Sequence, residues 1–184
     1  SEQVRDSRRL FLFFGGSDPT DETSKALRAL TTLTDYELKA DVVVGQTNPH
    51  RAAVEKRCRQ IPGMAYHSQV DNMAELMARA GLGLGAGGVT TYERCCLGLP
   101  TLITAIAENQ IAIGKGADEH GVARYLGRSS EVTAEMIAEA MAPFLKDATI
   151  AAQMAAKARA LVDGHGAQRV AEELFRLCER NVLV

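Results

Sequence analysis

Short apolar runs alternate with amphipathic stretches along this chain, and their order predicts a parallel α/β fold. Residues 10–14 form a continuous apolar run that ends in Gly15-Gly16, as is typical of a strand buried on both faces. A stretch with helical spacing follows, and the alternation of strand and helix is repeated about six times. We therefore predict a Rossmann-like, doubly wound parallel sheet of about six strands with helices on both faces. The further strands are predicted at residues 37–44, 64–68, 82–86, 100–106 and 122–126, followed by helices near 133–145, 149–162 and 167–178.

Polar residues at the starts of the predicted helices indicate where each helix is capped. Thr20 or Asp21 is expected to cap the first helix, which runs to about Leu33. Asp71 is expected to cap a helix in which Met73 and the apolar residues that follow share one face.

Two predicted strands end in glycine pairs, Gly15-Gly16 and Gly87-Gly88. Ligands of open parallel sheets bind beyond the carboxyl ends of the strands, and glycine lets the backbone approach them closely. A helix predicted to begin near Val89 would offer free N–H groups to a phosphate. Thr90 lies in its first turn and Glu93 on the same face, so this pair suits a phosphate and a ribose diol. A simple helix cap and a solvated glutamate explain the same spacing equally well.

The segment from Gly83 to Gly88 also contains the glycine spacing of a dinucleotide fingerprint, and Glu108 follows Gly88 by 20 residues. However, Gly83 and Gly85 fall inside the predicted strand, whereas fingerprint glycines belong in the turn after it. A Rossmann oxidoreductase domain therefore stays an outside alternative.

Four motifs, taken in order and spacing, resemble the C-terminal domain of the pseudaminic-acid-pathway UDP-sugar hydrolases. This family is similar to the glycosyltransferase-B enzymes, so the resemblance implies the C-terminal half of such a fold. It also implies release of UDP and a free sugar from a UDP-linked 2,4-diacetamido-2,4,6-trideoxy hexose, in the biosynthesis of pseudaminic acid or a related surface polysaccharide. The motifs are residues 13–19, residues 87–93, residues 97–100 with 107–110, and residues 163–170.

The resemblance also implies a role for each candidate site residue. Glu93 would hold the ribose, and Thr90 with the backbone of Gly87 and Gly88 would hold the α-phosphate. The backbone of Val70 would bind uracil, with Met73 packed nearby. Gly16 and Ser17 would border the diphosphate, and Asn109 and Gln110 would reach the sugar, where amides can bind hydroxyl and acetamide groups. Capping of the next helix is the alternative role for Asn109 and Gln110.

One departure from the family concerns the catalytic base. The family carries a glycine-rich loop with a histidine in its N-terminal domain, and no such loop precedes Leu10. His67 lies in a predicted strand, and His165 lies between glycines in a helix-breaking segment. We therefore expect no catalytic residue in this chain, a linker remnant at residues 1–9, a UDP-sugar-binding domain at 10–184, and an upstream N-terminal domain as its partner.

The composition indicates which kinds of partner and which cellular location to expect. Lys and Arg total 21 and Asp and Glu total 23, a balance that favours neither nucleic acid nor a membrane surface. The 4 cysteines lack zinc-site spacing, and adjacent Cys95 and Cys96 are expected to be buried and reduced, which favours a cytoplasmic location. We expect no metal, no cofactor and no insertion into a membrane. A UDP-sugar glycosyltransferase half and a non-catalytic nucleotide-sugar-binding module remain as alternatives to the hydrolase half.

Overall fold

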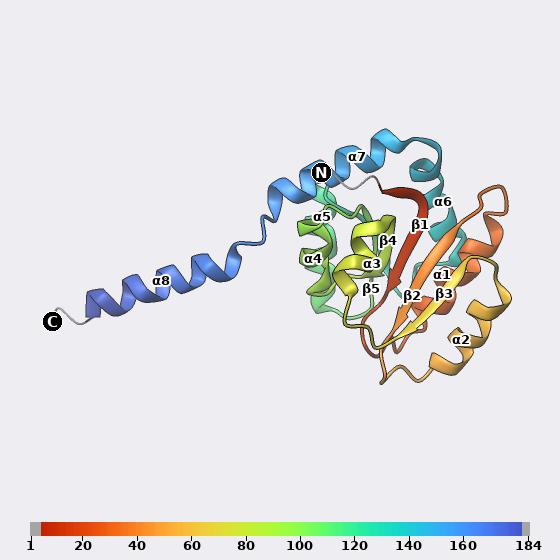
Figure 1. The fold of residues 1–184 in the computed structure, drawn as a ribbon, viewed down its shortest axis with the longest axis horizontal. Helices are drawn as coiled ribbons and strands as arrows, with labels where there is room; N and C mark the ends of the chain where they lie inside the picture. Colours follow the sequence, from red (N-terminus) through yellow and green to blue (C-terminus); the bar gives the residue numbers. More distant parts are fainter. Residues whose placement is uncertain (1–4, 182–184) are drawn as a thin grey trace.

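A six-stranded parallel sheet organises the residues that the structure, a computed structural model, describes, 5–181 (Figure 1). The strand order is β3-β2-β1-β4-β5-β6, so the chain winds outward from β1 to β3 and then returns to place β4 on the other side of β1. The switch in strand order therefore falls between β1 and β4. The strands are β1 Asp6–Phe13, β2 Lys39–Val44, β3 Met64–Ser68, β4 Ala80–Ala86, β5 Thr101–Ala105 and β6 Arg124–Arg128.

Helices cover both faces of this sheet, as the alternating pattern predicts. On one face, Leu10, Leu12 and Leu84 pack with buried residues of α1, α2 and α6. On the other face, Phe11 packs against α3, and Ile103 packs against α4 and α5. The helices are α1 Glu22–Thr32, α2 Arg51–Gln60, α3 Met73–Arg79, α4 Thr90–Cys96, α5 Asn109–Glu119, α6 Ala134–Lys146, α7 Ala148–Leu161 and α8 Gly166–Asn181.

The first strand begins earlier than the apolar run suggests. β1 starts at Asp6, which is paired with Ala80 of β4, so the expectation that a strand begins at Leu10 is wrong by four residues. Residues 6–8 are exposed, and pairing through the backbone leaves no apolar signal in the sequence. Arg5 donates to the carbonyl oxygens of Met77 and Ala80 at 2.8 and 2.6 Å. Of the expected linker remnant, residues 1–4 lie outside the described residues and 6–9 belong to the sheet.

The helix caps also differ from the expected ones. Asp18, and neither Thr20 nor Asp21, accepts hydrogen bonds from the N–H groups of Glu22 and Thr23, both at 2.9 Å. Asp21 has a left-handed backbone and its side chain makes no cap bond. At α3 the cap position is Asn72 instead of Asp71, again without a side-chain cap bond. The Asp18 carboxylate, held in a turn, thus caps the helix in place of the residue that directly precedes it.

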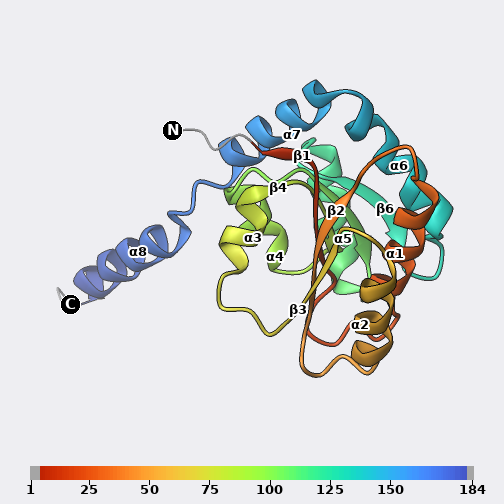
Figure 2. The same ribbon diagram turned by 45° about the vertical axis from the view of Figure 1, so that its right-hand side comes forward.

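The last helix, α8, projects away from the rest of the structure in both views (Figures 1 and 2). It follows a break at Gly164, whose φ is +80°. Val170, Leu174, Phe175 and Leu177 of α8 are exposed. An amphipathic helix normally buries such a stripe, so this face has no cover among the described residues.

The adjacent cysteines differ in their surroundings. Cys95 is buried and Cys96 is exposed, which corrects the expectation that both are buried. Consecutive helical residues point about 100° apart, so only one of them faces the sheet.

None of the described helices is both long enough and apolar enough to cross a membrane.

Candidate functional site

The predicted ligand-binding residues lie in four loops at one edge of the sheet and in the first turns of the helices that follow these loops. Because the strands are parallel, their carboxyl ends share this edge, and β1 and β4 meet there at the switch in strand order. The residues are Gly16 and Ser17 after β1, Val70 and Met73 after β3, Gly87, Gly88, Thr90 and Glu93 after β4, and Asn109 and Gln110 after β5.

The turn after β4 leads directly into α4. The backbone of Val89 is already helical, which agrees with a helix that begins near this residue. Within the described chain, the N–H groups of Gly88, Val89 and Thr90 donate to no backbone carbonyl, as is usual at the start of a helix. Glu93 is exposed, and no described residue forms an ion pair or side-chain hydrogen bond with its carboxylate. This end of α4 therefore offers N–H donors and one unengaged carboxylate.

Gln110 lies against this glycine turn. A Cβ added to Gly87 would come within 2.9 Å of the Gln110 carbonyl oxygen, and one added to Gly88 within 3.8 Å of Gln110 Nε2. The Gln110 Oε1 accepts a hydrogen bond from the Ile106 N–H at 3.1 Å, so its amide nitrogen is left as a donor beside Gly88. Gln110 thus ties down the loop after β5, whereas the cap position of α5, Glu108, makes no side-chain cap bond. Asn109 is exposed at the start of α5.

The loop after β1 is anchored from two sides. The Thr47 hydroxyl donates to the Gly16 carbonyl oxygen at 3.1 Å, which connects this loop to the one after β2. Asp18 is buried, and its carboxylate also accepts from the Thr23 hydroxyl at 2.7 Å. These contacts leave Gly16 and Ser17 exposed at the edge of the sheet.

Val70 and Met73 lie on the α3 side of the same edge. Both are partly buried in the apolar cluster that contains Phe11 and Leu76, and Leu97, directly after α4, belongs to this cluster. The turn after β3 therefore packs beside the end of α4. No described backbone group donates to or accepts from Val70 in a hydrogen bond outside the regular elements.

The glycines of the dinucleotide-like spacing have a packing role. Gly83 and Gly85 lie inside β4, where Gly83 contacts Thr101 and Leu99. Glu108, at the position of the fingerprint acid, forms an ion pair with Arg128 with oxygen–nitrogen distances of 2.6 and 3.0 Å. The spacing thus arises from close packing within a buried strand.

Sequence reasoning missed Arg94, which lies in α4 next to Glu93. Arg94 is the largest fully buried side chain among the described residues, at 1% exposure. Its guanidinium donates to the Ala86 carbonyl oxygen at 2.7 Å and to the hydroxyls of Thr91 and Thr90 at 3.0 and 3.3 Å. Burial lowers the pKa of Arg94 to about 10, so it stays protonated at neutral pH. The sequence gives no signal for its burial, because Gly85 and Ala86, which it meets, come from β4.

A cluster of charged and polar side chains surrounds Asp41 of β2. His67 of β3 bonds Asp41 at 2.8 Å. Asp41 is buried, and Arg9 and Arg79 also donate to it at 2.8 and 2.7 Å. Burial alone would raise the pKa of Asp41, but hydrogen bonds from Arg79, Arg9 and His67 outweigh it and hold the pKa below its ordinary value.

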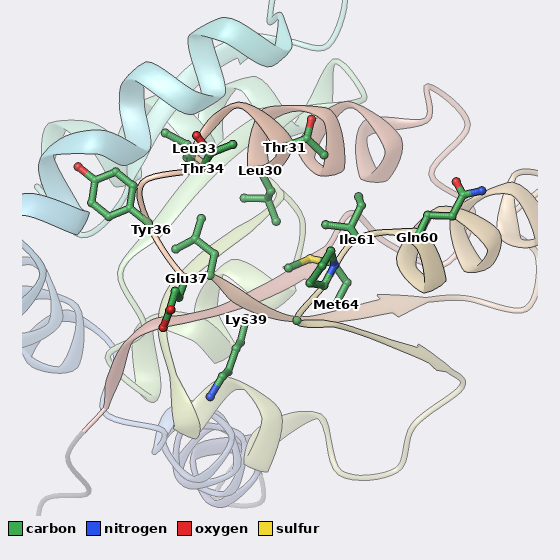
Figure 3. Close-up of a pocket in the computed structure, with 13 residues that line it drawn as sticks. Leu30, Thr31, Leu33, Thr34, Tyr36, Glu37, Lys39, Gln60, Ile61 and Met64 are labelled. Carbon is green, nitrogen blue, oxygen red and sulfur yellow. The ribbon is translucent and has the colours of Figure 1, made fainter.

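A separate hollow of about 520 Å³ lies at the opposite edge of the sheet (Figure 3). Lys39 and Met64, at the amino ends of β2 and β3, line it together with Leu30, Tyr36 and Ile61. Its lining is mostly apolar, and amino ends of parallel strands are not where such sheets bind ligands. Within residues 5–181 no group of metal-binding side chains comes together at either edge.

Comparison with curated sequences finds a relative whose name refers to polysaccharide biosynthesis. The chain is 32% identical to the spore coat polysaccharide biosynthesis protein SpsG of Bacillus subtilis (strain 168) over 179 residues, which cover 97% of the chain and 53% of SpsG. This chain is therefore similar in sequence to about half of SpsG. It spans about half the length of SpsG, so the two share one domain-sized region. An uncharacterized protein of Methanocaldococcus jannaschii is 29% identical over 102 residues, covering 54% of the chain and 21% of that protein. No family model matches the chain.

Several solved structures with the same fold are glycosyltransferases. MurG of Acinetobacter baumannii superposes with a TM-score of 0.75 at 19% identity, over 95% of the chain and 51% of MurG. The glycosyltransferase VinC, solved with dTDP, superposes with a TM-score of 0.73 at 14% identity, over 97% of the chain and 43% of VinC. At this identity the likeness establishes the fold, which is the Rossmann-like half of a glycosyltransferase-B structure, as the resemblance implied.

Proposed function

We propose that this domain binds a nucleotide sugar at the carboxyl edge of its sheet and serves as the donor-binding half of a polysaccharide-biosynthesis enzyme. The observation that carries the proposal is that four polar or glycine-rich segments, after β1, β3, β4 and β5, share the carboxyl edge of the sheet, with the segments after β1 and β4 side by side at the switch in strand order. Homology to SpsG supports the pathway, and VinC, which has the same fold, was solved with a nucleoside diphosphate.

The proposed contacts follow the chemistry of each loop. The diphosphate lies against Gly87, Gly88 and Thr90, where unengaged N–H groups favour anions. Gly16 and Ser17 border it from the loop after β1. The unengaged Glu93 carboxylate accepts hydrogen bonds from the ribose hydroxyls.

The base and the sugar lie on opposite sides of the diphosphate. Uracil pairs with the backbone of Val70 beside Met73, and the sugar extends toward Asn109 and Gln110. The Gln110 amide nitrogen beside Gly88 suits a hydroxyl or acetamide oxygen.

The chemistry itself requires a second domain. In this proposal the anomeric carbon lies between the two halves, and UDP leaves with its developing charge met by the N–H groups and hydroxyls of this half. A base in the upstream half activates water in a hydrolase or an acceptor hydroxyl in a transferase. The proposal is supported by the 53% coverage of SpsG and by the uncovered apolar face of α8.

Ligand binding is tested by the thermal stability of the chain with UDP, dTDP, UDP-GlcNAc, CMP, GDP and NAD. A ligand that binds only the folded state at 100 times its Kd stabilises it by about 2.7 kcal/mol, which shifts the melting temperature by several degrees. We expect shifts with UDP and UDP-GlcNAc. A shift with NAD alone would contradict the proposal and favour the oxidoreductase alternative.

Glu93→Ala tests the ribose contact. We expect UDP affinity to fall by about 1–3 kcal/mol, because a charged hydrogen-bond partner is lost. Calorimetry with Glu139→Ala, an exposed glutamate of α6, provides the control, and its affinity should stay at the wild-type value. Equal UDP affinity of Glu93→Ala and wild type would remove Glu93 from the site.

The hydrolase and transferase alternatives differ in what happens without an acceptor. The hydrolase should release UDP and free sugar in water once the upstream half of a full-length homologue is joined to this chain. A transferase joined in the same way should release little free sugar until an acceptor is added. Full turnover by this chain alone would refute the need for a second half.

A further inference from the structure

Arg94 is a buried cation whose described partners are all neutral. Its three hydrogen bonds end on the Ala86 carbonyl and the hydroxyls of Thr91 and Thr90, and its Nε finds no acceptor. The neighbouring Glu93 raises the pKa of Arg94 through space but makes no hydrogen bond with it. A charge removed from water without an ionic partner is unfavourable, and an apolar side chain would fill the space at less cost. Packing alone therefore gives a weak reason for an arginine at this position.

The position of the guanidinium suggests a second reason. It lies over Gly85, where a Cβ would come within 2.4 Å of Nη1 and within 2.6 Å of the Phe13 carbonyl oxygen. Phe13 ends β1 and Ala86 ends β4, so the charge lies between the two strands at the switch in strand order. The Gly87-Gly88 turn begins directly after the carbonyl that Arg94 binds.

The contact with Thr90 fixes the direction of one hydrogen bond. A guanidinium only donates, so the Thr90 oxygen must act as the acceptor in this pair. The Thr90 hydroxyl proton is then available to another acceptor. Within the described residues no acceptor for it is present.

We propose that Arg94 is a positioning residue for the diphosphate, which orients the Thr90 hydroxyl as a donor and supplies a buried positive charge beneath the glycine turn. This inference rests on the proposed function. It predicts that Arg94 strengthens the binding of the phosphates and contributes little to that of the nucleoside, whose uracil lies on the α3 side and whose ribose is held by the exposed Glu93 carboxylate. A purely structural arginine would affect both equally.

The test compares UDP and uridine binding by calorimetry or NMR titration. Arg94→Met keeps the bulk and removes the charge, and Arg28→Met removes an exposed charge from α1 as the control. We expect Arg94→Met to bind UDP 10- to 100-fold more weakly, with uridine affinity changed less than twofold and Arg28→Met unchanged. Equal losses for UDP and uridine, or no loss for UDP, would overturn the proposal.

A double-mutant cycle tests the path through Thr90. Thr90→Val should also weaken UDP selectively, and the double variant should lose less than the product of the two single losses, because the residues act through one contact. Fully multiplicative losses would refute the orienting role.

Arg94→Lys decides the question should Arg94→Met fail to fold. Lysine keeps the charge but cannot reach the Ala86 carbonyl and the Thr90 hydroxyl with one planar fork. We expect a 3- to 10-fold loss of UDP relative to uridine, and no loss would overturn the proposal. Wild-type protein that binds neither UDP nor uridine would refute the proposed function as well, whereas wild-type binding with unaltered ratios in the variants would refute the role of Arg94 alone.

Discussion

Replacing Gly85 by alanine is the sharpest test of how β4 and α4 pack. The new Cβ would lie 2.4 Å from Arg94 Nη1 and 2.6 Å from the Phe13 carbonyl oxygen, whereas ordinary contact begins at 3.4 Å. One of these obstacles is backbone of the neighbouring strand. The side chain of Arg94 is the only one of the two that can move without displacing β1.

The size of the destabilisation follows from the contacts that would be lost if Arg94 moved. Adding a methyl group to a filled core costs about 1–3 kcal/mol. Moving Arg94 would also deprive the Ala86 carbonyl of its side-chain donor, and a buried polar group left without a partner costs about 1–3 kcal/mol. We therefore expect Gly85→Ala to lower the free energy of unfolding by about 3 kcal/mol or more.

Urea unfolding followed by circular dichroism measures this change. With a slope of about 2 kcal/mol per molar urea, the midpoint should fall by about 1.5 M. Gly116→Ala is the matched control, since a Cβ there meets nothing within 4 Å and Gly116 lies inside α5. Its midpoint should rise slightly, because alanine favours a helix by about 1 kcal/mol over glycine. A Gly85→Ala midpoint equal to that of the wild type would refute the packing of Arg94 on Gly85.

Two further predictions concern buried carboxylates. Asp41→Asn should destabilise the fold by about 3 kcal/mol at pH 7, because a buried acceptor of hydrogen bonds from Arg9, Arg79 and His67 loses its charge. The folded pKa of Asp41 lies below the ordinary 3.8, so its contribution is complete above that value and is lost as the pH falls through the folded pKa. Urea midpoints of the variant and the wild type should therefore converge as the pH falls below 3.8, and a constant difference would contradict this reasoning. Asp18→Ala should cost about 2 kcal/mol through the loss of the α1 cap, whereas exposed Asp35→Ala should change the midpoint little.

Local patterns were enough to predict the sheet and most of its helices. Strands β1 to β6 were all expected, and β3 was predicted with its observed bounds, because buried parallel strands appear as apolar runs between turn residues. The glycine pairs after β1 and β4 were recognised for the same reason. Ends that depend on backbone pairing alone, such as Asp6 in β1, carry no such signal.

The hydrogen-bond partners of buried polar groups could not be predicted from such local patterns. Asp18 caps α1 from four residues away through a left-handed turn, and Asp41 gathers donors from β1, β3 and α3. Each contact depends on which segments of the chain meet in the folded structure, and no residue spacing in the sequence indicates where they meet. Arg94 belongs to the same class, since its neighbours Gly85 and Phe13 come from two strands.

The order of apolar and polar residues by itself determined a six-stranded α/β domain whose glycine turns follow β1 and β4. Period and turn chemistry are local properties, so the sequence contains them directly. Only the tertiary structure decided that β1 and β4 are neighbours, that both turns therefore lie at one edge, and that a buried arginine lies between them. Strand order and burial depend on contacts between residues far apart in the chain, and those contacts exist only once the sheet has formed.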